Sequence, residues 1–305
     1  MFNLIRPNTN YDFIGTSRIW ITVSSILVVA SLFIFFTKGL NYGVDFTGGI
    51  EMQIKFDDKT INSQTLRSIM SEIKSGDVQV QKFSDSSANE YLIRVEGNES
   101  DLTAVTKDIE NKLAIKFSKG SYDIRKIEIV GPKVGKELKT SAVYSLIYAM
   151  LGIFIYIAIR FNYKFSPGAI ISIIHDVLIT VGVYSICGYQ FTLSTVAALL
   201  AIVGYSVNDT VVIYDRIREI AEKQKGSPLS VIINKAVNET LGRTILTSLI
   251  TLLCVSMILF FGGPSLRDFA FPLVVGMISG VYSTVFIASP VIIFMERMSQ
   301  KKEAR

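Results

Sequence analysis

Six long blocks of apolar residues constrain this chain more than any other feature of its sequence. They cover residues 19–36, 142–159, 165–186, 193–214, 245–261 and 269–294. Each block is close to the roughly 20 residues that a helix needs to cross a hydrocarbon core of about 30 Å. Half of the 305 residues are hydrophobic and only 19% are charged, which is unlike a soluble domain. The sequence therefore predicts an α-helical membrane protein with six transmembrane helices.

A polar segment, residues 37–139, separates the first apolar block from the second and is long enough to bury a core of its own. Apolar and polar residues alternate strictly over Ile50–Phe56, which predicts a half-buried strand. Helical periodicity predicts helices over Ser63–Lys74 and Asp101–Lys116, with Leu66, Ile69, Met70 and Ile73 on one face of the first and Leu102, Val105, Ile109 and Leu113 on one face of the second. Further strands are predicted at Val78–Phe83, Tyr91–Val95 and Tyr122–Val130. The order strand-helix-strand-strand-helix-strand predicts an α+β ferredoxin-like domain.

Positive charge is concentrated next to the apolar blocks. The net charge is +5, yet residues 37–139 hold sixteen basic and sixteen acidic side chains, so the charge does not indicate a nucleic-acid partner. Basic residues lie in segment 1–18, in the loop between the second and third blocks, in a helix-prone segment at about 217–243, and in the tail 295–305. The positive-inside rule then predicts that both termini are cytoplasmic and that the domain 37–139 is external. Residues 140–294 would hold the second to sixth transmembrane helices.

The sequence carries no motif for a nucleotide, a metal or a redox centre. Walker, Cys-x-x-Cys and His-Glu-x-x-His patterns are all missing. Its two cysteines, Cys187 and Cys254, lie at the end of one apolar block and inside another, which does not suit a disulfide framework. The sequence therefore predicts a protein that is not an enzyme, needs no cofactor, and draws on an energy source other than bound nucleotide.

Asp209 is the most informative polar residue in the apolar blocks. It lies in the run Gly204-Tyr205-Ser206-Val207-Asn208-Asp209-Thr210. A carboxyl group in lipid is costly, so Asp209 is predicted to face protein or water and to mark a functional site. Arg243, at the start of the fifth block, is predicted at a similar depth. An Asp209 that meets Arg243 in one conformation and loses it in another would release and take up a proton. The alternative is a permanent ion pair that locks two helices together.

Other residues of the apolar blocks are candidates for the same site. His175 and Asp176 are adjacent in the third block and project about 100° apart on a helix. They could relay protons to Asp209, because histidine titrates near physiological pH, or one of them could simply bind a neighbouring helix. Asn208 is predicted to orient the site rather than to carry protons. Gly204 and Ser206 are small and are predicted to allow close helix packing.

A second motif, Asp45-Phe46-Thr47-Gly48-Gly49, opens the external domain. Its paired glycines allow backbone conformations that other residues avoid. Catalysis would require a second group of matched geometry near Asp45, and the sequence supplies none. Asp45, Gly48 and Gly49 are therefore interpreted as a structural turn in preference to a substrate contact.

Taken together, these motifs resemble those of SecF, the smaller subunit of the SecDF protein-export complexes, which are related to the RND transporters. The resemblance is carried in order by Asp45–Gly49, Val130–Leu138, His175–Asp176, Gly204–Glu219 and Arg243–Ser248. It covers nearly the whole chain. It implies a multi-pass protein of the bacterial inner membrane whose external domain is periplasmic.

The resemblance also implies a function. A protein of this family would use the proton-motive force to promote translocation of unfolded polypeptide emerging from the SecYEG channel, with SecD as its partner in the membrane. The proton-site roles would fall on Asp209 and Arg243, and then on His175 and Asp176. Two other classes stay open: an RND-type half-transporter that exports a small molecule, and a passive membrane assembly subunit.

Overall fold

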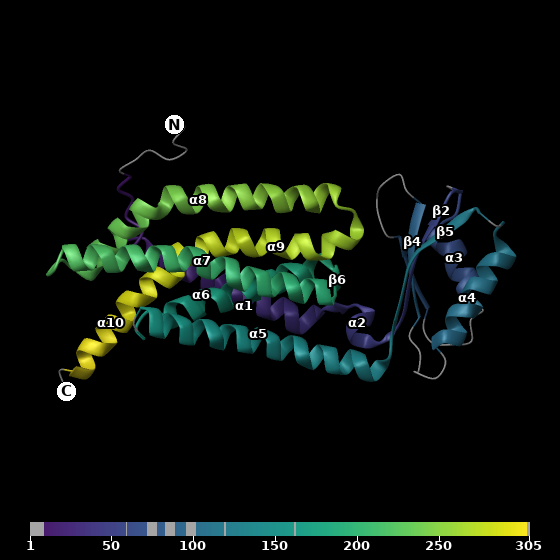
Figure 1. Ribbon diagram of the computed structural model, residues 1–305, viewed down its shortest axis with the longest axis horizontal. Helices are drawn as coiled ribbons and strands as arrows, with labels where there is room; N and C mark the ends of the chain where they lie inside the picture. The colour runs from purple at the N-terminus through teal and green to yellow at the C-terminus, as the bar shows by residue number, and fades with distance from the viewer. Residues whose placement is uncertain are drawn as a thin grey trace. The chain divides into compact units, whose positions relative to one another are not determined.

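The computed structural model describes residues 9–58, 60–71, 78–82, 89–95, 102–118, 120–161 and 163–303. The chain divides into two compact units (Figure 1). We call residues Tyr42–Val143 the sheet unit, and residues Met1–Asn41 with Tyr144–Arg305 the helical unit.

The sheet unit confirms the predicted order of strands and helices. Its main elements are β2 (Gly49–Phe56), α3 (Ser63–Met70), β3 (Val78–Lys82), β4 (Asn89–Val95), α4 (Leu102–Lys116) and β5 (Tyr122–Val130). The four strands form an antiparallel sheet in the order β3-β4-β2-β5, so the two strands that flank each helix are not neighbours. This is the ferredoxin-like arrangement that the sequence predicted. The register of β2 against β5 shifts between Gln53 and Ile54.

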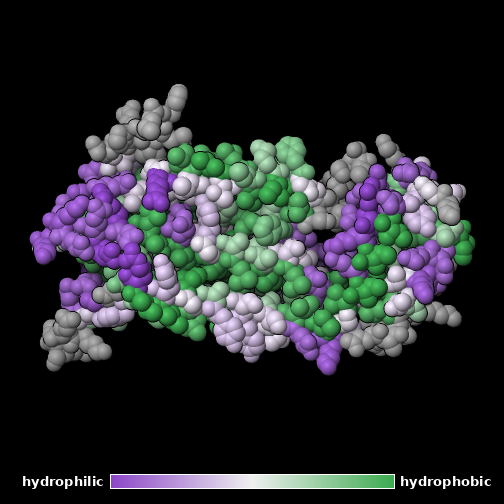
Figure 2. Space-filling view, in the orientation of Figure 1, coloured by the Kyte–Doolittle hydropathy of each residue, from purple (hydrophilic) through white to green (hydrophobic). Residues whose placement is uncertain are grey.

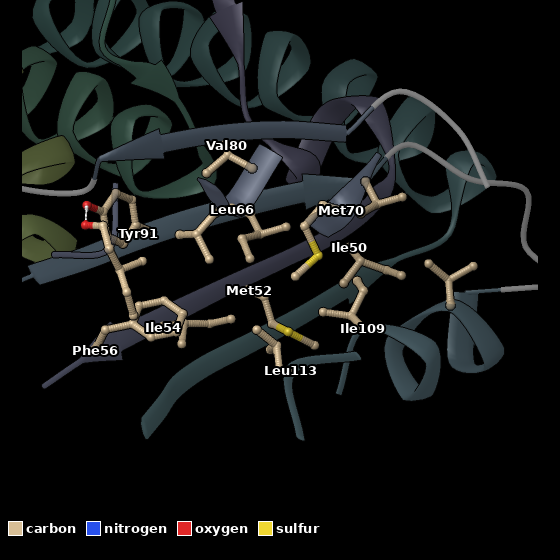
Figure 3. Close-up of a cluster of buried hydrophobic side chains, with 14 of the residues drawn as sticks. Ile50, Met52, Ile54, Phe56, Leu66, Met70, Val80, Tyr91, Ile109 and Leu113 are labelled. Atoms are coloured by element: carbon tan, nitrogen blue, oxygen red, sulfur yellow. Dashed lines mark hydrogen bonds between the residues drawn. The ribbon is translucent and has the colours of Figure 1, made fainter. Parts of the chain in front are cut away.

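The core of the sheet unit lies between one face of the sheet and the two helices (Figure 3). Alternate residues of β2 point into it, and Ile50, Met52, Ile54 and Phe56 are at most 1% exposed. The predicted buried faces of both helices are confirmed for Leu66, Met70, Leu102, Val105, Ile109 and Leu113. Ile73, Lys74 and Phe83, which the sequence placed at the ends of a helix and a strand, lie outside the described residues. Full burial of each large apolar side chain contributes about 1.5–3 kcal/mol.

Two short strands and a short helix complete the set of smaller elements. They are β1 (Asn41–Tyr42), β6 (Gln190–Phe191) and α2 (Val44–Thr47). The predicted glycine turn therefore begins with one turn of helix. The predicted end of the last strand is confirmed, because β5 stops at Val130 and α5 begins at Pro132.

Six helices among the described residues are long and apolar enough to cross a membrane. They are α1 (Ser17–Lys38), α5 (Pro132–Arg160), α6 (Ser166–Cys187), α7 (Leu193–Lys223), α8 (Leu229–Phe261) and a last span built from α9 (Pro264–Ser283), the π-helical turn η1 (Thr284–Ala288) and α10 (Ser289–Glu303). Figure 2 shows hydrophobic residues along this unit and hydrophilic residues at the end where α7 stops and α8 starts.

The centre of the helical unit is formed by α6, α7 and the last span. In these helices 44%, 50% and 61% of the most apolar window is buried, against 17% or less in α1, α5 and α8. Small residues allow this packing, as expected where lipid supplies no hydrophobic drive. A Cβ at Gly276 of α9 would lie 2.3 Å from Ile202 of α7, and a Cβ at Gly182 of α6 would lie 2.4 Å from Ser31 of α1.

The helices extend beyond the apolar blocks that predicted them. The segment at about 217–243, expected as a separate cytoplasmic helical segment, is divided between the end of α7 and the start of α8, which a turn at residues 224–228 joins. The sheet unit spans 42–143, whereas the predicted external domain spans 37–139. It starts later because α1 continues to Lys38, and it ends later because the first residues of α5, up to Val143, belong to it.

Candidate functional site

Asp209 lies near the middle of α7 and is 3% exposed. The start of α7 is fixed by Thr192, whose side chain accepts a hydrogen bond from the backbone N–H of Thr195. Asp209 Oδ2 accepts a hydrogen bond from Ser248 Oγ of α8 at 3.1 Å. The carboxylate is therefore enclosed between two helices of the chain.

Arg243 lies on α8, five residues before Ser248, and its side chain is exposed. No ion pair joins it to Asp209 in the part of the chain that the structure describes. Arg243 instead lines a groove of about 610 Å³, which we call the α7–α8 groove. Its charged lining consists of Arg160, Asp215, Arg216, Arg218, Glu219, Glu222, Glu239 and Arg243.

The other arginines of the α7–α8 groove are all paired. Arg216 forms ion pairs with Glu219 and Glu239. Asp215 forms ion pairs with Arg160 at 3.5 Å and with Arg218 at 3.7 Å. Among the described residues, Arg243 is thus the groove arginine without a carboxylate partner. The structure brings it close to the turn that holds Asp209 but does not join the two.

Asp176 lies in α6 and is fully buried. Its Oδ2 accepts hydrogen bonds from Ser206 of α7 and Ser283 of α9, both at 2.8 Å. Its Oδ1 accepts from Ser279 of α9 at 2.6 Å and lies 3.0 Å from His175 Nδ1. Although adjacent helical residues project about 100° apart, the two side chains contact each other. We call these five residues the Asp176 cluster.

His175 is also buried, with its ring 5.9 Å from that of Tyr282. Its Nε2 is enclosed without a hydrogen-bond partner among the described residues. No described residue links His175 to Asp209 by a hydrogen bond, so a direct relay between them is absent from this arrangement.

The small residues of the α7 motif have different surroundings. Ser206 is buried in the Asp176 cluster. Gly204 is exposed, and a Cβ added there would meet no atom within 4 Å, so its predicted packing role finds no helix within this chain. Asn208 is exposed as well and makes no hydrogen bond to Asp209 in the described structure, so it does not orient that carboxylate here.

The glycine motif belongs to the sheet unit. Asp45 lies in α2, and Gly48 and Gly49 follow with φ angles of +76° and +125°. A Cβ at Gly48 would lie 2.7 Å from the Cα of Pro132, where α5 begins. This geometry fits the interpretation of the motif as a structural turn. Across the described residues, no group of three or more His, Cys, Asp or Glu side chains could hold a metal ion.

Residues 110–298 match the family model described as protein export membrane protein SecD/SecF, C-terminal, and residues 33–60 match the SecD/SecF GG motif. The chain is 42% identical over 302 residues to the protein translocase subunit SecF of Calditerrivibrio nitroreducens, which covers 98% of each chain. It is also 42% identical over 299 residues to that of Magnetococcus marinus, covering 97% of this chain and 95% of the relative. The chain belongs to the SecF family.

SecF membership is matched by the fold. The chain superposes on the crystal structure of SecDF from Thermus thermophilus with a TM-score of 0.83 and 32% identity, covering 96% of this chain and 40% of that one. For SecDF in its super-membrane-facing form the TM-score is 0.70 at 32% identity, with 98% and 41% covered. The chain therefore spans about two fifths of the SecDF chains that it matches. As a SecF family member it is a membrane protein of the protein-transport class, as the resemblance implied.

Ser248, Ser279 and Ser283 are site residues whose role the sequence did not reveal. The sequence motifs included Ser248 only as the end of Arg243–Ser248, and they singled out neither Ser279 nor Ser283. The available signal was the spacing of Ser279 and Ser283, because two hydroxyls four residues apart share one face of an apolar helix. Which carboxylate they meet depends on how the helices are rotated, which a sequence pattern does not give.

Proposed function

We propose that this SecF family member uses the proton-motive force to promote the movement of unfolded polypeptide across the bacterial inner membrane, and that Asp209 exchanges the proton under the control of Arg243. One observation carries the proposal. Among the described residues, enclosed Asp209 of α7 has one hydrogen bond, from Ser248 of α8, and Arg243, five residues before Ser248, forms no ion pair with a carboxylate.

The number of donors makes Asp209 suitable for proton exchange. A carboxylate offers about four acceptor positions, and here one is used. A second state in which Arg243 reaches Asp209 would favour the charged carboxylate more than the present arrangement, in which no ion pair among the described residues joins the two. Exchanging Ser248 for Arg243 would require α8 to move and turn relative to α7, because five residues of helix span about 7.5 Å and project about 140° apart. Proton uptake and release would then accompany a helix movement.

The available energy limits what such a cycle does. One charge crossing about 100 mV releases about 2.3 kcal/mol, whereas a folded domain is stable by about 5–15 kcal/mol. One proton per step could bias the forward movement of an unfolded segment but could not unfold a domain. The proposed cycle is therefore a ratchet.

The proposal includes partners and an orientation. The SecDF structures that match this chain are more than twice its length, which supports SecD as the second half of the assembly. The polypeptide would come from the SecYEG channel. The basic end of the helical unit, where α7 and α8 meet, would be cytoplasmic with both termini, and the sheet unit would be periplasmic.

The test is the export of a secretory polypeptide into membrane vesicles, measured with and without an imposed proton gradient, by chains carrying Asp209→Asn. We expect this variant to export at one rate in both conditions, because the amide cannot exchange a proton. Asp215→Asn is the matched control, since Asp215 lies on the same helix but is half-exposed and paired in the α7–α8 groove. It should respond to the gradient as the wild type does.

Arg243 gives the second arm of this test. Arg243→Lys keeps a positive charge and should retain part of the gradient response, whereas Arg243→Gln should lose it. A normal gradient response by Asp209→Asn would contradict the proposal and favour a passive assembly subunit. A response limited to a small-molecule export assay would favour an RND-type half-transporter.

A further inference from the structure

The Asp176 cluster differs from the Asp209 site in how many acceptor positions are occupied. Asp176 receives three serine hydroxyls at 2.6–2.8 Å and faces His175 Nδ1 at 3.0 Å, two partners on each oxygen. These four partners match the roughly four acceptor positions of a carboxylate. An added proton would occupy one of these positions, so one of the four contacts would have to reverse or break. Asp209, with its one donor, has room for a proton without losing a bond.

The four partners also come from three helices. His175 belongs to α6 itself, Ser206 to α7, and Ser279 and Ser283 to α9, where Ser283 is the last residue before the π-helical turn η1. Gly280 lies between the two α9 serines, and a Cβ there would be 3.5 Å from Ser206 and 3.6 Å from Asp176, so the helices meet closely at this level. The bonds therefore hold the most buried helices of the helical unit together.

Ser206 connects this cluster with the proposed proton site. It precedes Asp209 by three residues, less than one turn of α7. The bond from Ser206 to Asp176 fixes the rotation of that turn relative to α6 and α9. α8 also packs on α7 through apolar side chains, but in the apolar part of the described structure one side-chain hydrogen bond joins them, from Ser248 to Asp209.

We propose that Asp176 is a positioning residue and not a proton carrier: its filled carboxylate ties α6, α7 and α9 into one block and so fixes the turn of α7 that presents Asp209 to α8. This inference rests on the proposed function of Asp209. It assigns the two buried carboxylates different roles, and it makes α8 the helix that moves relative to the block. The charged or titratable groups that face Asp176 are His175 from α6 and, behind it, the ring of Tyr282 from α9.

The first test separates the two roles by infrared spectroscopy of the full chain in lipid. Difference spectra between mildly acidic and mildly alkaline pH report carboxylic acids that gain a proton while shielded from water. The band of shielded carboxylic acids should keep its full intensity in Asp176→Asn and lose the contribution of Asp209 in Asp209→Asn. A band that disappears in Asp176→Asn and persists in Asp209→Asn would overturn the inference.

The second test uses gradient-dependent export and does not depend on that band. Ser206→Ala should lower the export rate by about tenfold or more, the effect of one lost hydrogen bond to a charged group, and Ser206→Thr should restore it. Asp176→Ala should lower export at least as much, and the double variant Asp176→Ala with Ser206→Ala should be no worse than Asp176→Ala alone, because both changes remove the bond between these two residues. Additive losses would overturn the inference.

Ser172→Ala is the matched control for these variants. Ser172 is fully buried in α6 like Asp176, but its hydroxyl donates only to Ala169 O of its own helix, at 2.8 Å. It should export at the wild-type rate and respond to pH as the wild type does. If the band of a shielded carboxylic acid does not change with pH in the wild type, the proposal that Asp209 carries the proton is wrong. The export measurements on Ser206 would still decide the role of Asp176.

Discussion

Gly48 has a backbone conformation that other residues adopt only with strain, and it has a neighbour that leaves no room for a side chain. Its φ is +76°, and a Cβ would lie 2.7 Å from the Cα of Pro132. We expect Gly48→Ala to lower the free energy of unfolding by more than the roughly 1–2 kcal/mol that the left-handed conformation alone costs an L-residue. Gly120→Ala is the control, because Gly120 has φ +95° with no atom within 4 Å. Thermal unfolding of the full chain in detergent would compare them, and equal losses would show that α5 yields readily at Pro132.

Glu51 gives the sheet unit a pH dependence of defined sign. Burial raises the pKa of this carboxyl above its usual range, although Arg94 donates to it at 2.9 Å. Between the ordinary and the raised pKa the folded chain binds more protons than the unfolded chain, so the stability due to Glu51 is full at low pH and is lost as pH rises through that window. Measured by thermal unfolding across pH, the stability of the wild type relative to Glu51→Gln should therefore fall as pH rises.

Asp58 supplies the comparison of opposite sign. The backbone N–H of Thr60, at 2.9 Å, and its hydroxyl, at 2.8 Å, lower the pKa of the Asp58 carboxyl. The contribution of Asp58 is therefore present above its ordinary pKa and is lost as pH falls. The stability of the wild type relative to Asp58→Asn should rise with pH through the same series. If both stability differences changed in the same direction with pH, burial would not explain the effect of Glu51.

At the scale of single elements, α7 presents one face to the chain and another outward. Ala197, Ala201, Gly204 and Asn208 are spaced along its exposed face. If SecD covers this face, as the proposed assembly requires, Gly204→Leu should leave the chain folded but prevent its co-purification with SecD. Gly276→Leu is the contrasting variant, because a Cβ there already lies 2.3 Å from Ile202 inside the chain. It should lower thermal stability, by about 1–3 kcal/mol or more, before any partner is added.

The elements themselves could be predicted from the sequence because each follows a local pattern. Alternation over Ile50–Phe56 gave β2, and apolar blocks of sufficient length gave the spans. The helix-prone segment at about 217–243 was predicted, but its continuity with α7 and α8 was not, because polar helical turns have no apolar block to show which span they extend. Asp209 was found because a buried carboxylate is rare in an apolar run, whereas its partner Ser248 depends on the rotation of a second helix.

At the scale of the whole molecule, each unit has a core of its own. The sheet unit buries a continuous cluster between its sheet and α3 and α4, and the helical unit buries separate clusters around α6, α7 and the last span. In water the first core is stabilised by removing apolar surface from solvent, whereas in lipid the packing of helices depends on close contact and on polar bonds such as those of Asp176. The two units should therefore respond to different perturbations.

This difference predicts that residues 42–143, expressed alone, fold into a soluble domain. Its unfolding by denaturant should be a single cooperative transition, and Leu113→Ala should lower its stability by about 2–5 kcal/mol, because Leu113 is fully buried in its core. In the full chain, Leu113→Ala should lower the unfolding temperature of the sheet unit. Below that temperature, the dependence of export on the proton gradient, which we assign to Asp209, should be unchanged. A loss of that response with the sheet unit still folded would show that the two cores are not independent, and that the buried apolar cluster beneath β2 takes part in coupling.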